Sequence, residues 1–422
     1  MSTSRPKLPV VAIAAITAGA ASAAEVDFRP ILTFGVYHDG NIAVTGEEGS
    51  GDEVATLGLE LILDRRTPQS LFTFSYHPSY VAYNKSEGLD YFSNTLALSY
   101  SRNWTTQTRL TVGADAGRTD RQGLRVTGAD RPVTFLPRTT QDFGHGSLGG
   151  TFAAGRRALI DWGIGAGVSR SEDVPDNPAT PAVDDPVDYN DSVDFSARGA
   201  WRREISERTT LGLGLDASYF DFEATDSVFV ESLGLVGSYN TARTMTLAYA
   251  LGATRANSAD DSDTAMYVDV TLTKMPTETS TFGAGLRQTY TPGSGIGGAS
   301  QDRGGWVSYD HTSPVRGVNA TLLGGYWERL VVEFPSATPP PPGTPIAGDT
   351  KTFTVSGTVG WSFNRHVALN AAYAYVDQRA KDQSGAPPEF ADSLDTRYGS
   401  YGINLRWNIT GRGATPWTPG TR

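Results

Sequence analysis

Residue types that carry out catalysis or bind metals are scattered along this sequence. The five histidines stand at positions 38, 77, 145, 311 and 366, and none has the spacing of a metal motif such as HExxH. The stretch 145–149, HGSLG, comes close to a nucleophile elbow but lacks its first glycine and its strand-to-helix context. We therefore expect loop or rim histidines, no catalytic residue, no metal site and no cofactor.

Two other stretches resemble ligand sites only in part. The glycines of 163–167, GIGAG, do not form a dinucleotide fingerprint, because no helix is predicted after them. The acidic stretch 173–191 lacks the spacing of a Ca²⁺-binding loop. We interpret the first as the glycine-lined face of a strand and the second as an exposed, proline-rich loop.

Charged residues recur instead within apolar, glycine-rich segments. Asp161, for example, lies between Ile160 and Trp162. Such a charge is tolerated where it faces water, whereas an Arg or Lys that faces lipid at the bilayer midplane costs about 2–4 kcal/mol. Alternation therefore predicts nine charged residues on the wall of an aqueous interior: Glu60, Arg109, Asp115, Asp161, Arg202, Asp216, Asp269, Arg287 and Arg406. Two roles stay open: opposed acidic and basic walls that order polar solutes, or charges that pair and stiffen the wall.

The segments that carry these residues alternate between apolar and polar positions, which is the pattern of β-strands. In 352–363, Phe353, Val355 and Val359 share one face, while threonines and serines share the other. The segments 158–169, 211–219 and 265–273 repeat the pattern.

The alternation fails at one place. After Tyr219, Phe220 and Phe222 fall on the polar side and Asp221 falls on the apolar side. This indicates either a strand end at the membrane surface or a β-bulge.

A soluble β-sandwich would also alternate, but three features favour a transmembrane barrel. The runs are about twice as long as the roughly 5–6 residues of soluble strands, which suits a tilted strand that crosses a bilayer. Their polar faces are rich in glycine and small residues rather than in Lys and Glu. Short links alternate with long ones, as periplasmic turns and outer loops do in such barrels.

The sequence therefore predicts an all-β fold: a closed antiparallel transmembrane β-barrel of about eighteen strands, with short periplasmic turns and long extracellular loops. One missed or extra hairpin would give sixteen or twenty strands instead. The predicted strands are 26–37, 54–63, 70–83, 91–103, 107–118, 140–153, 157–170, 190–204, 208–222, 229–239, 243–255, 264–274, 279–291, 303–311, 316–331, 351–363, 366–379 and 394–409.

Aromatic residues near strand ends are expected to form a girdle at each membrane surface. The periplasmic girdle is predicted to contain Trp104, Trp361, Phe363 and Trp407. The outer girdle is predicted to contain Tyr37, Tyr83, Tyr91 and Tyr219. The long links 119–138 and 332–350 are the candidates for a loop that folds into the lumen.

Both ends of the chain differ from the predicted barrel, 25–410. Residues 1–24 combine a charged start, a short apolar stretch and small residues, which predicts a signal peptide cleaved after Ala23 or Ala24. The tail 411–422 predicts a disordered extension. The net charge of −11 argues against a nucleic-acid partner, and the lack of cysteine excludes a disulfide framework.

The last predicted strand contains SYGINLRW at 400–407. Ser400, Gly402, Leu405 and Trp407 match a polar-x-Gly-x-x-apolar-x-aromatic pattern. This pattern resembles the assembly signal of outer-membrane barrels, although that signal usually ends the protein and this chain continues past Trp407. The resemblance implies the barrel-insertion machinery and periplasmic chaperones as partners, with outer-membrane lipid around the barrel.

A second resemblance rests on the opening strand and on the hairpin that follows. The residues that carry it are Pro30, Gly35, Tyr37, Asp39, Asn41 and Ile42, then 76–83 and Asp90-Tyr91. Here the chain resembles the porin-2-like family of outer-membrane β-barrels associated with exopolysaccharide export. The resemblance implies a channel for polar solutes or an exported polysaccharide, with polysaccharide export proteins as candidate partners.

We expect a channel rather than an enzyme. Two alternatives from other classes stay open: a hydrolase embedded in the outer membrane, and a surface adhesin or scaffold whose lumen is blocked.

Overall fold

The computed structural model describes residues 24–40, 51–85, 90–120, 140–171, 191–222, 226–242, 244–258, 262–292, 299–313, 317–332, 349–380 and 396–410. No helix in these ranges is long and apolar enough to cross a membrane. The ranges form eighteen strands: β1 (Glu25–Asp39), β2 (Asp52–Arg66), β3 (Ser70–Tyr83), β4 (Tyr91–Asn103), β5 (Thr108–Asp120), β6 (Thr140–Ala153), β7 (Ala158–Ser171), β8 (Ser192–Ser206), β9 (Thr209–Phe222), β10 (Val228–Ala242), β11 (Met245–Asn257), β12 (Ser262–Thr277), β13 (Ser280–Pro292), β14 (Ala299–Ser313), β15 (Val318–Val332), β16 (Thr350–Ser362), β17 (Val367–Ala380) and β18 (Thr396–Asn408).

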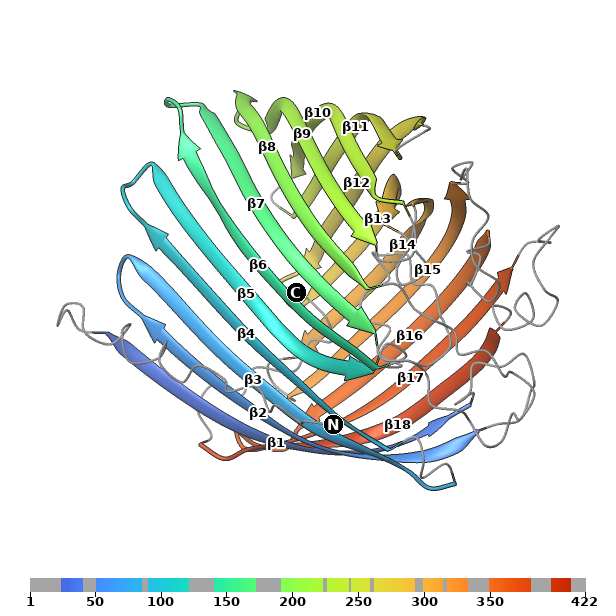
Figure 1. Cartoon of the computed structure of the whole chain (residues 1–422). Coiled ribbons are helices and arrows are strands. Elements are labelled where there is room, and N and C mark those ends of the chain that lie inside the picture. Colours follow the sequence, from blue (N-terminus) through green and yellow to red (C-terminus); the bar gives the residue numbers. More distant parts are fainter. Residues whose placement is uncertain are drawn as a thin grey trace, which may run out of the picture.

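The strands form one closed antiparallel barrel (Figure 1). Each strand pairs with its neighbours in the chain, and β1 also pairs with β18, from Ile31↔Asn408 to Asp39↔Ser400. Closure leaves no open sheet edge, so every strand has a hydrogen-bonding partner on both sides. The predicted fold and the predicted number of strands are both confirmed.

Connections alternate in length around the barrel. The links after β2, β4, β6 and β8 are 67–69, 104–107, 154–157 and 207–208, whereas that after β5 is 121–139. We call the two ends of the barrel the short-turn end and the long-link end. In barrels of this kind the long loops face the cell exterior, which gives the expected orientation of the chain.

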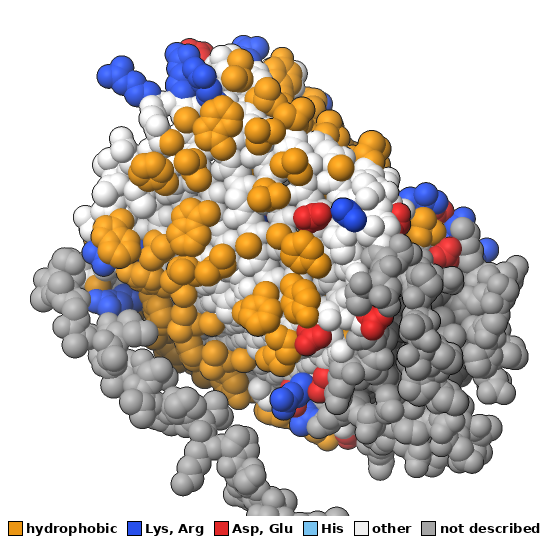
Figure 2. All heavy atoms as spheres, turned by 45° about the horizontal axis from the view of Figure 1, so that its top comes forward, with side chains coloured by type: hydrophobic (Ala, Val, Ile, Leu, Met, Phe, Trp, Pro, Cys, Tyr) orange, Lys and Arg blue, Asp and Glu red, His pale blue; other side chains and the backbone are white. Residues whose placement is uncertain are grey.

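Hydrophobic side chains cover the outside of the barrel. Figure 2 shows them spread over the face in view, with most of the charged side chains towards its ends. The outward set includes the apolar residues predicted to face lipid, among them Leu213, Met266 and Val359. A surface this apolar is unfavourable in water and favourable in hydrocarbon, so the barrel is built to sit in a membrane.

The predicted girdles are correct at the short-turn end and mostly wrong at the other end. Trp104, Trp361, Phe363 and Trp407 are all exposed, and the rings of Trp361 and Phe363 lie 4.9 Å apart. At the long-link end Tyr219 is exposed as expected.

The other three tyrosines of the predicted outer girdle do not face outward. Tyr37 and Tyr91 pack against a buried inward cluster that Tyr83 forms with Val54 and Val81. The register explains this, because Tyr37 and Tyr83 both pair with Val54 on β2, on the face opposite to exposed Leu57.

The break in alternation after Tyr219 is a strand end and not a bulge. The register runs without a shift through Val193↔Asp221 and Val228↔Phe220. Phe222 is instead buried in an inward apolar cluster with Val228 and Val230. The inner surface is therefore not uniformly polar, since it carries apolar clusters near the long-link end.

Candidate functional site: the charged inner wall

Cross-strand register defines the inner wall, because residues paired between neighbouring strands share a face. Asp161, for example, pairs with Thr151 and Ala200, while exposed Ile160 beside it pairs with Phe152 and Trp201. All nine charged residues predicted to point inward lie on this inner face, opposite the exposed hydrophobic residues. They are Glu60, Arg109, Asp115, Asp161, Arg202, Asp216, Asp269, Arg287 and Arg406.

Six of these residues form three ion pairs along the wall. Asp269 on β12 accepts from Arg287 on β13. Asp161 on β7 accepts a 2.8 Å hydrogen bond from Arg202 Nε on β8. Glu60 on β2 accepts one of 2.8 Å from Arg406 on β18, across the intervening β1. The sequence left two roles open for these charges. These six residues adopt the second role, in which a charge pairs with an opposite charge on the same wall.

The remaining predicted charges lie beside other polar groups. Asp115 Oδ2 is 3.0 Å from Nδ1 of His145. Asp216 stands directly across from Arg198 in the β8–β9 register. Arg109 pairs in register with Asn103 and Thr151 at the short-turn end.

The inner wall also contains several residues that are not among the nine predicted from the sequence. His77 and His145 were expected in loops or at rims, yet both lie within strands and face inward with Glu60 and Asp115. At the long-link end, Asp302 is fully buried and accepts hydrogen bonds of 2.8 and 3.1 Å from Arg329. At the short-turn end, Arg29 pairs with Asp64. Alternation within each strand would have found all of them, since each has the parity opposite to that of the exposed apolar residues on its own strand.

One aromatic side chain lies flat on this wall. Trp306 faces inward opposite Gly285, and a Cβ atom on Gly285 would meet its Nε1 at 2.4 Å. A Cβ on Gly283 would meet the far edge of the same indole at 2.8 Å. The two glycines are therefore required for the indole to lie against the sheet, one strand away from the Asp269–Arg287 pair.

The predicted assembly signal lies on the closing strand. Leu405 and Trp407 are exposed on the outer face, whereas Ser400 is buried. A Cβ atom at Gly402 would lie 2.3 Å from the Cβ of Tyr37 on β1. Glycine is thus the residue that lets β1 and β18 approach each other here.

The structure also brings together Ser280 and His311, with 2.9 Å between Oγ and Nδ1. A nucleophile beside a base is the minimal part of a covalent catalytic site, which further needs a group that orients the base. Among the described residues, no carboxylate bonds to the His311 ring. No group of three or more potential metal ligands occurs in those residues either.

A closed eighteen-stranded barrel with an apolar exterior and a charged inner wall is a β-barrel of the outer-membrane type. No family model and no curated protein matches the chain. Among solved structures it is similar to the FrpB iron transporter (F5-1 variant) from Neisseria meningitidis, with a TM-score of 0.47, 11% identity and coverage of 86% of this chain and 64% of that chain. The chain thus spans less than two thirds of FrpB.

It is also similar to OccK2 (OpdF) from Pseudomonas aeruginosa, with a TM-score of 0.45, 14% identity and coverage of 91% of this chain and 98% of that one. For the outer membrane protein OpdK from the same organism the TM-score is 0.43, with 12% identity and coverage of 91% and 99%. Similarities at this level do not indicate what this chain binds or transports.

Proposed function

We propose that the protein is a passive outer-membrane channel for polar solutes, lined by the nine charged residues named above. The observation that carries the proposal is the division of faces: the nine charged residues share the inner side of the closed sheet, and the exposed hydrophobic residues share the outer side. Barrels of about 16–18 strands are wide enough to leave an aqueous channel. Charged groups on the inner face have the low energetic cost expected for a water-filled lumen.

Conductance of the purified protein in a planar lipid bilayer tests the channel. We expect steady current steps that depend on the protein and scale with salt concentration. A folded, inserted protein that gives no conductance would contradict the proposal and favour an adhesin or an enzyme. Ser280→Ala should leave conductance unchanged, and loss of a lipid-hydrolysing activity in that variant would instead support the hydrolase.

A narrower form of the proposal is passage of an exported polysaccharide. It is supported by the resemblance of the opening strand and by the inward Trp306, whose indole offers a flat apolar surface beside a charged pair. Deletion of the gene and assay of secreted polymer test it, with Trp306→Ala as the matched variant. Unchanged secretion together with normal conductance would contradict passage of a polysaccharide, but it would not contradict the channel.

We also propose that the insertion machinery recognises β18 through Ser400, Gly402, Leu405 and Trp407. Support comes from the exposure of Leu405 and Trp407 on one face of this strand. Trp407→Ser should reduce insertion into membranes that contain the machinery but not folding into detergent. Equal losses in both assays would contradict recognition. The signal peptide at 1–24 and the tail at 411–422 stay predictions, since residues 1–23 and 411–422 lie outside the described residues.

A further inference from the structure

A row of charged side chains crosses the outer face of four neighbouring strands near the long-link end. Its members pair in register across β14 to β17: Arg303↔Glu328, Glu328↔Lys351 and Lys351↔Arg379. They share the outward face with exposed Tyr326 and Phe353. These two aromatic residues form the register pair that lies two positions from Glu328 and Lys351, on β15 and β16. Asp377 and Arg397 form a second register pair beside the row. We call these six residues, which together span β14 to β18, the outer charged row.

The cations of this row are its outermost groups. Glu328 lies 2.6 Å from Arg303 and 3.2 Å from Lys351, and its side chain is only 17% exposed, against 47% and 44% for the two cations. Asp377 likewise is 18% exposed, whereas its partner Arg379 is 71% exposed. Four cations against two covered carboxylates give the row a positive outer surface.

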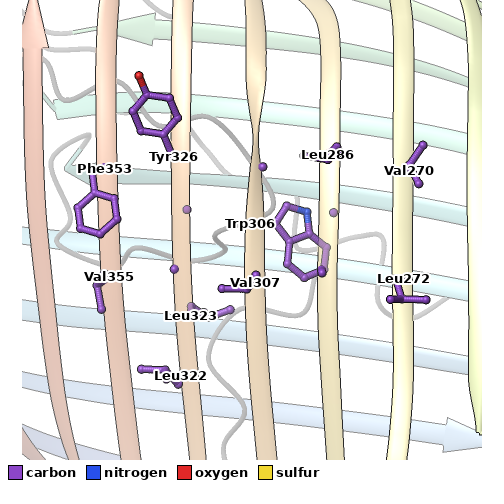
Figure 3. Close-up of a pocket in the computed structure, with 15 residues that line it drawn as sticks. Val270, Leu272, Leu286, Trp306, Val307, Leu322, Leu323, Tyr326, Phe353 and Val355 are labelled. Carbon is purple, nitrogen blue, oxygen red and sulfur yellow. The ribbon is translucent and has the colours of Figure 1, made fainter.

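An apolar hollow of about 720 Å³ lies next to the row, towards the middle of the sheet (Figure 3). Tyr326 and Phe353 stand at the end nearest the row, and Val355, Val307 and Leu322 follow along the strands. Its outward residues form two register rows that each contain a glycine. The first is Val270, Leu286, Gly305, Tyr326 and Phe353, and the second is Leu272, Ala284, Val307, Gly324 and Val355.

Gly324 opens the hollow, because it has no side chain in a row whose other members project outward. At Gly305 the space is taken by Leu286, whose Cδ2 atom would lie 2.7 Å from an added Cβ atom. A Cβ atom on Gly324 would meet only Val307 Cγ2, at 3.7 Å, and the carbonyl oxygen of Thr354, at 3.9 Å. The space above Gly324 is therefore open to an apolar group that approaches from outside the barrel.

We propose that the outer charged row and the hollow together form a binding site for a phosphorylated lipid of net negative charge in the surrounding leaflet. The phosphate accepts charge-assisted hydrogen bonds from Arg303, Lys351 and Arg379. An acyl chain lies in the hollow and covers its apolar lining. The match is in both charge and position, because a lipid carries its phosphate at the membrane surface and its chains towards the midplane, in the same order as the row and the hollow. Cations on the outer face are tolerated there, since the cost of an exposed Arg falls to about 0–1 kcal/mol near the interface.

Native mass spectrometry of the full, detergent-purified protein tests the site. The probes are lipid A, which is a phosphorylated glycolipid, and phosphatidylcholine, each added separately. We expect the wild type to retain lipid A in preference to phosphatidylcholine. The variant Arg303→Gln/Lys351→Gln/Arg379→Gln should bind lipid A at least about tenfold more weakly than the wild type does.

The matched control removes three outward cations at the short-turn end: Arg102→Gln/Arg203→Gln/Lys274→Gln. It should retain lipid A like the wild type, since it makes the same change in net charge far from the row. Folding of each variant is checked by its heat-modifiable migration on gels. Should the triple variant fail to fold, Arg379→Gln replaces it, because this side chain is the most exposed of the three.

Gly324→Leu tests the hollow without altering charge. Its side chain fills the space above the sheet, so it should weaken retention of lipid A while the charged row stays intact. Equal retention of both lipids by the wild type, or equal losses in the row variant and the short-turn control, would overturn the proposal. Unchanged retention by Gly324→Leu would overturn the part assigned to the hollow.

Discussion

Arg287 on β13 directs its Nε and Nη2 atoms at one oxygen of Asp269 on β12, at 3.1 and 2.8 Å. Both side chains remain about 30% exposed. The pair is therefore partly hydrated, and its contribution to stability should be about 0.2–1 kcal/mol. Its larger effect is expected on the ions that pass it.

Arg287→Gln should increase cation selectivity, because it leaves the Asp269 carboxylate uncompensated on the inner wall. Asp269→Asn should shift selectivity towards anions for the opposite reason. The double variant should return close to the wild type. The reversal potential in a salt gradient measures this, and Arg203→Gln on the outer face is the control. Identical reversal potentials in the wild type and both single variants of the pair would contradict the proposed pore lining.

Arg329→Met should strongly destabilise the barrel. It removes both hydrogen bonds that Arg329 donates to Asp302, whose carboxylate is fully buried. Loss of one member of a buried pair costs about 3–5 kcal/mol. Urea-induced unfolding in lipid vesicles measures the change. Arg170→Met is the control, since Arg170 is 76% exposed and 4.0 Å from Asp191, and a similar cost in both variants would show that burial is not the cause.

Gly402→Ala should hinder closure of the barrel. The new Cβ would stand 2.3 Å from Tyr37 Cβ and 2.6 Å from the Val36 carbonyl oxygen, so the backbones of β1 and β18 must separate. Gly324→Ala makes only ordinary contacts, at 3.7 Å or more, and serves as the matched control. The fraction of chain that folds into detergent is the measurement. Equal yields for the two variants would mean that the seam tolerates the extra methyl group.

Val268→Arg should lower stability by about 2–4 kcal/mol, the cost of Arg on a lipid-facing surface near the midplane. Val268 pairs with Leu251 on the outer face, whereas Thr271 on the same strand pairs with Ala248 on the inner face. Thr271→Arg should therefore be nearly neutral. Unfolding in vesicles compares the two. A larger cost for Thr271→Arg would reverse the assignment of the two faces.

The strand pattern was predictable because a transmembrane sheet with two different environments imposes period-two alternation on every segment. Leu213 and Met266 had to face lipid once Asp216 and Asp269 were placed in water, and the structure agrees. The same reasoning located the charged wall.

Specific pairs could not be predicted, because a partner depends on register and side-chain reach as well as on face. Glu60 and Arg406 are far apart in the chain and are separated by β1 in the sheet. The error over Tyr83 has a related cause. Its place near a strand end suggested a girdle, but the face on which it lies was decided by its register with Val54.

The seam between β1 and β18 joins residues as distant in the sequence as Ile31 and Asn408. Until β18 is available, β1 and β17 each expose a row of unsatisfied amide and carbonyl groups, which hydrocarbon does not tolerate. Insertion one hairpin at a time into bare lipid is therefore disfavoured, and the nearly complete polypeptide must be kept from aggregating before it enters the bilayer. A chain truncated before β18 should accumulate outside the membrane rather than form a smaller barrel.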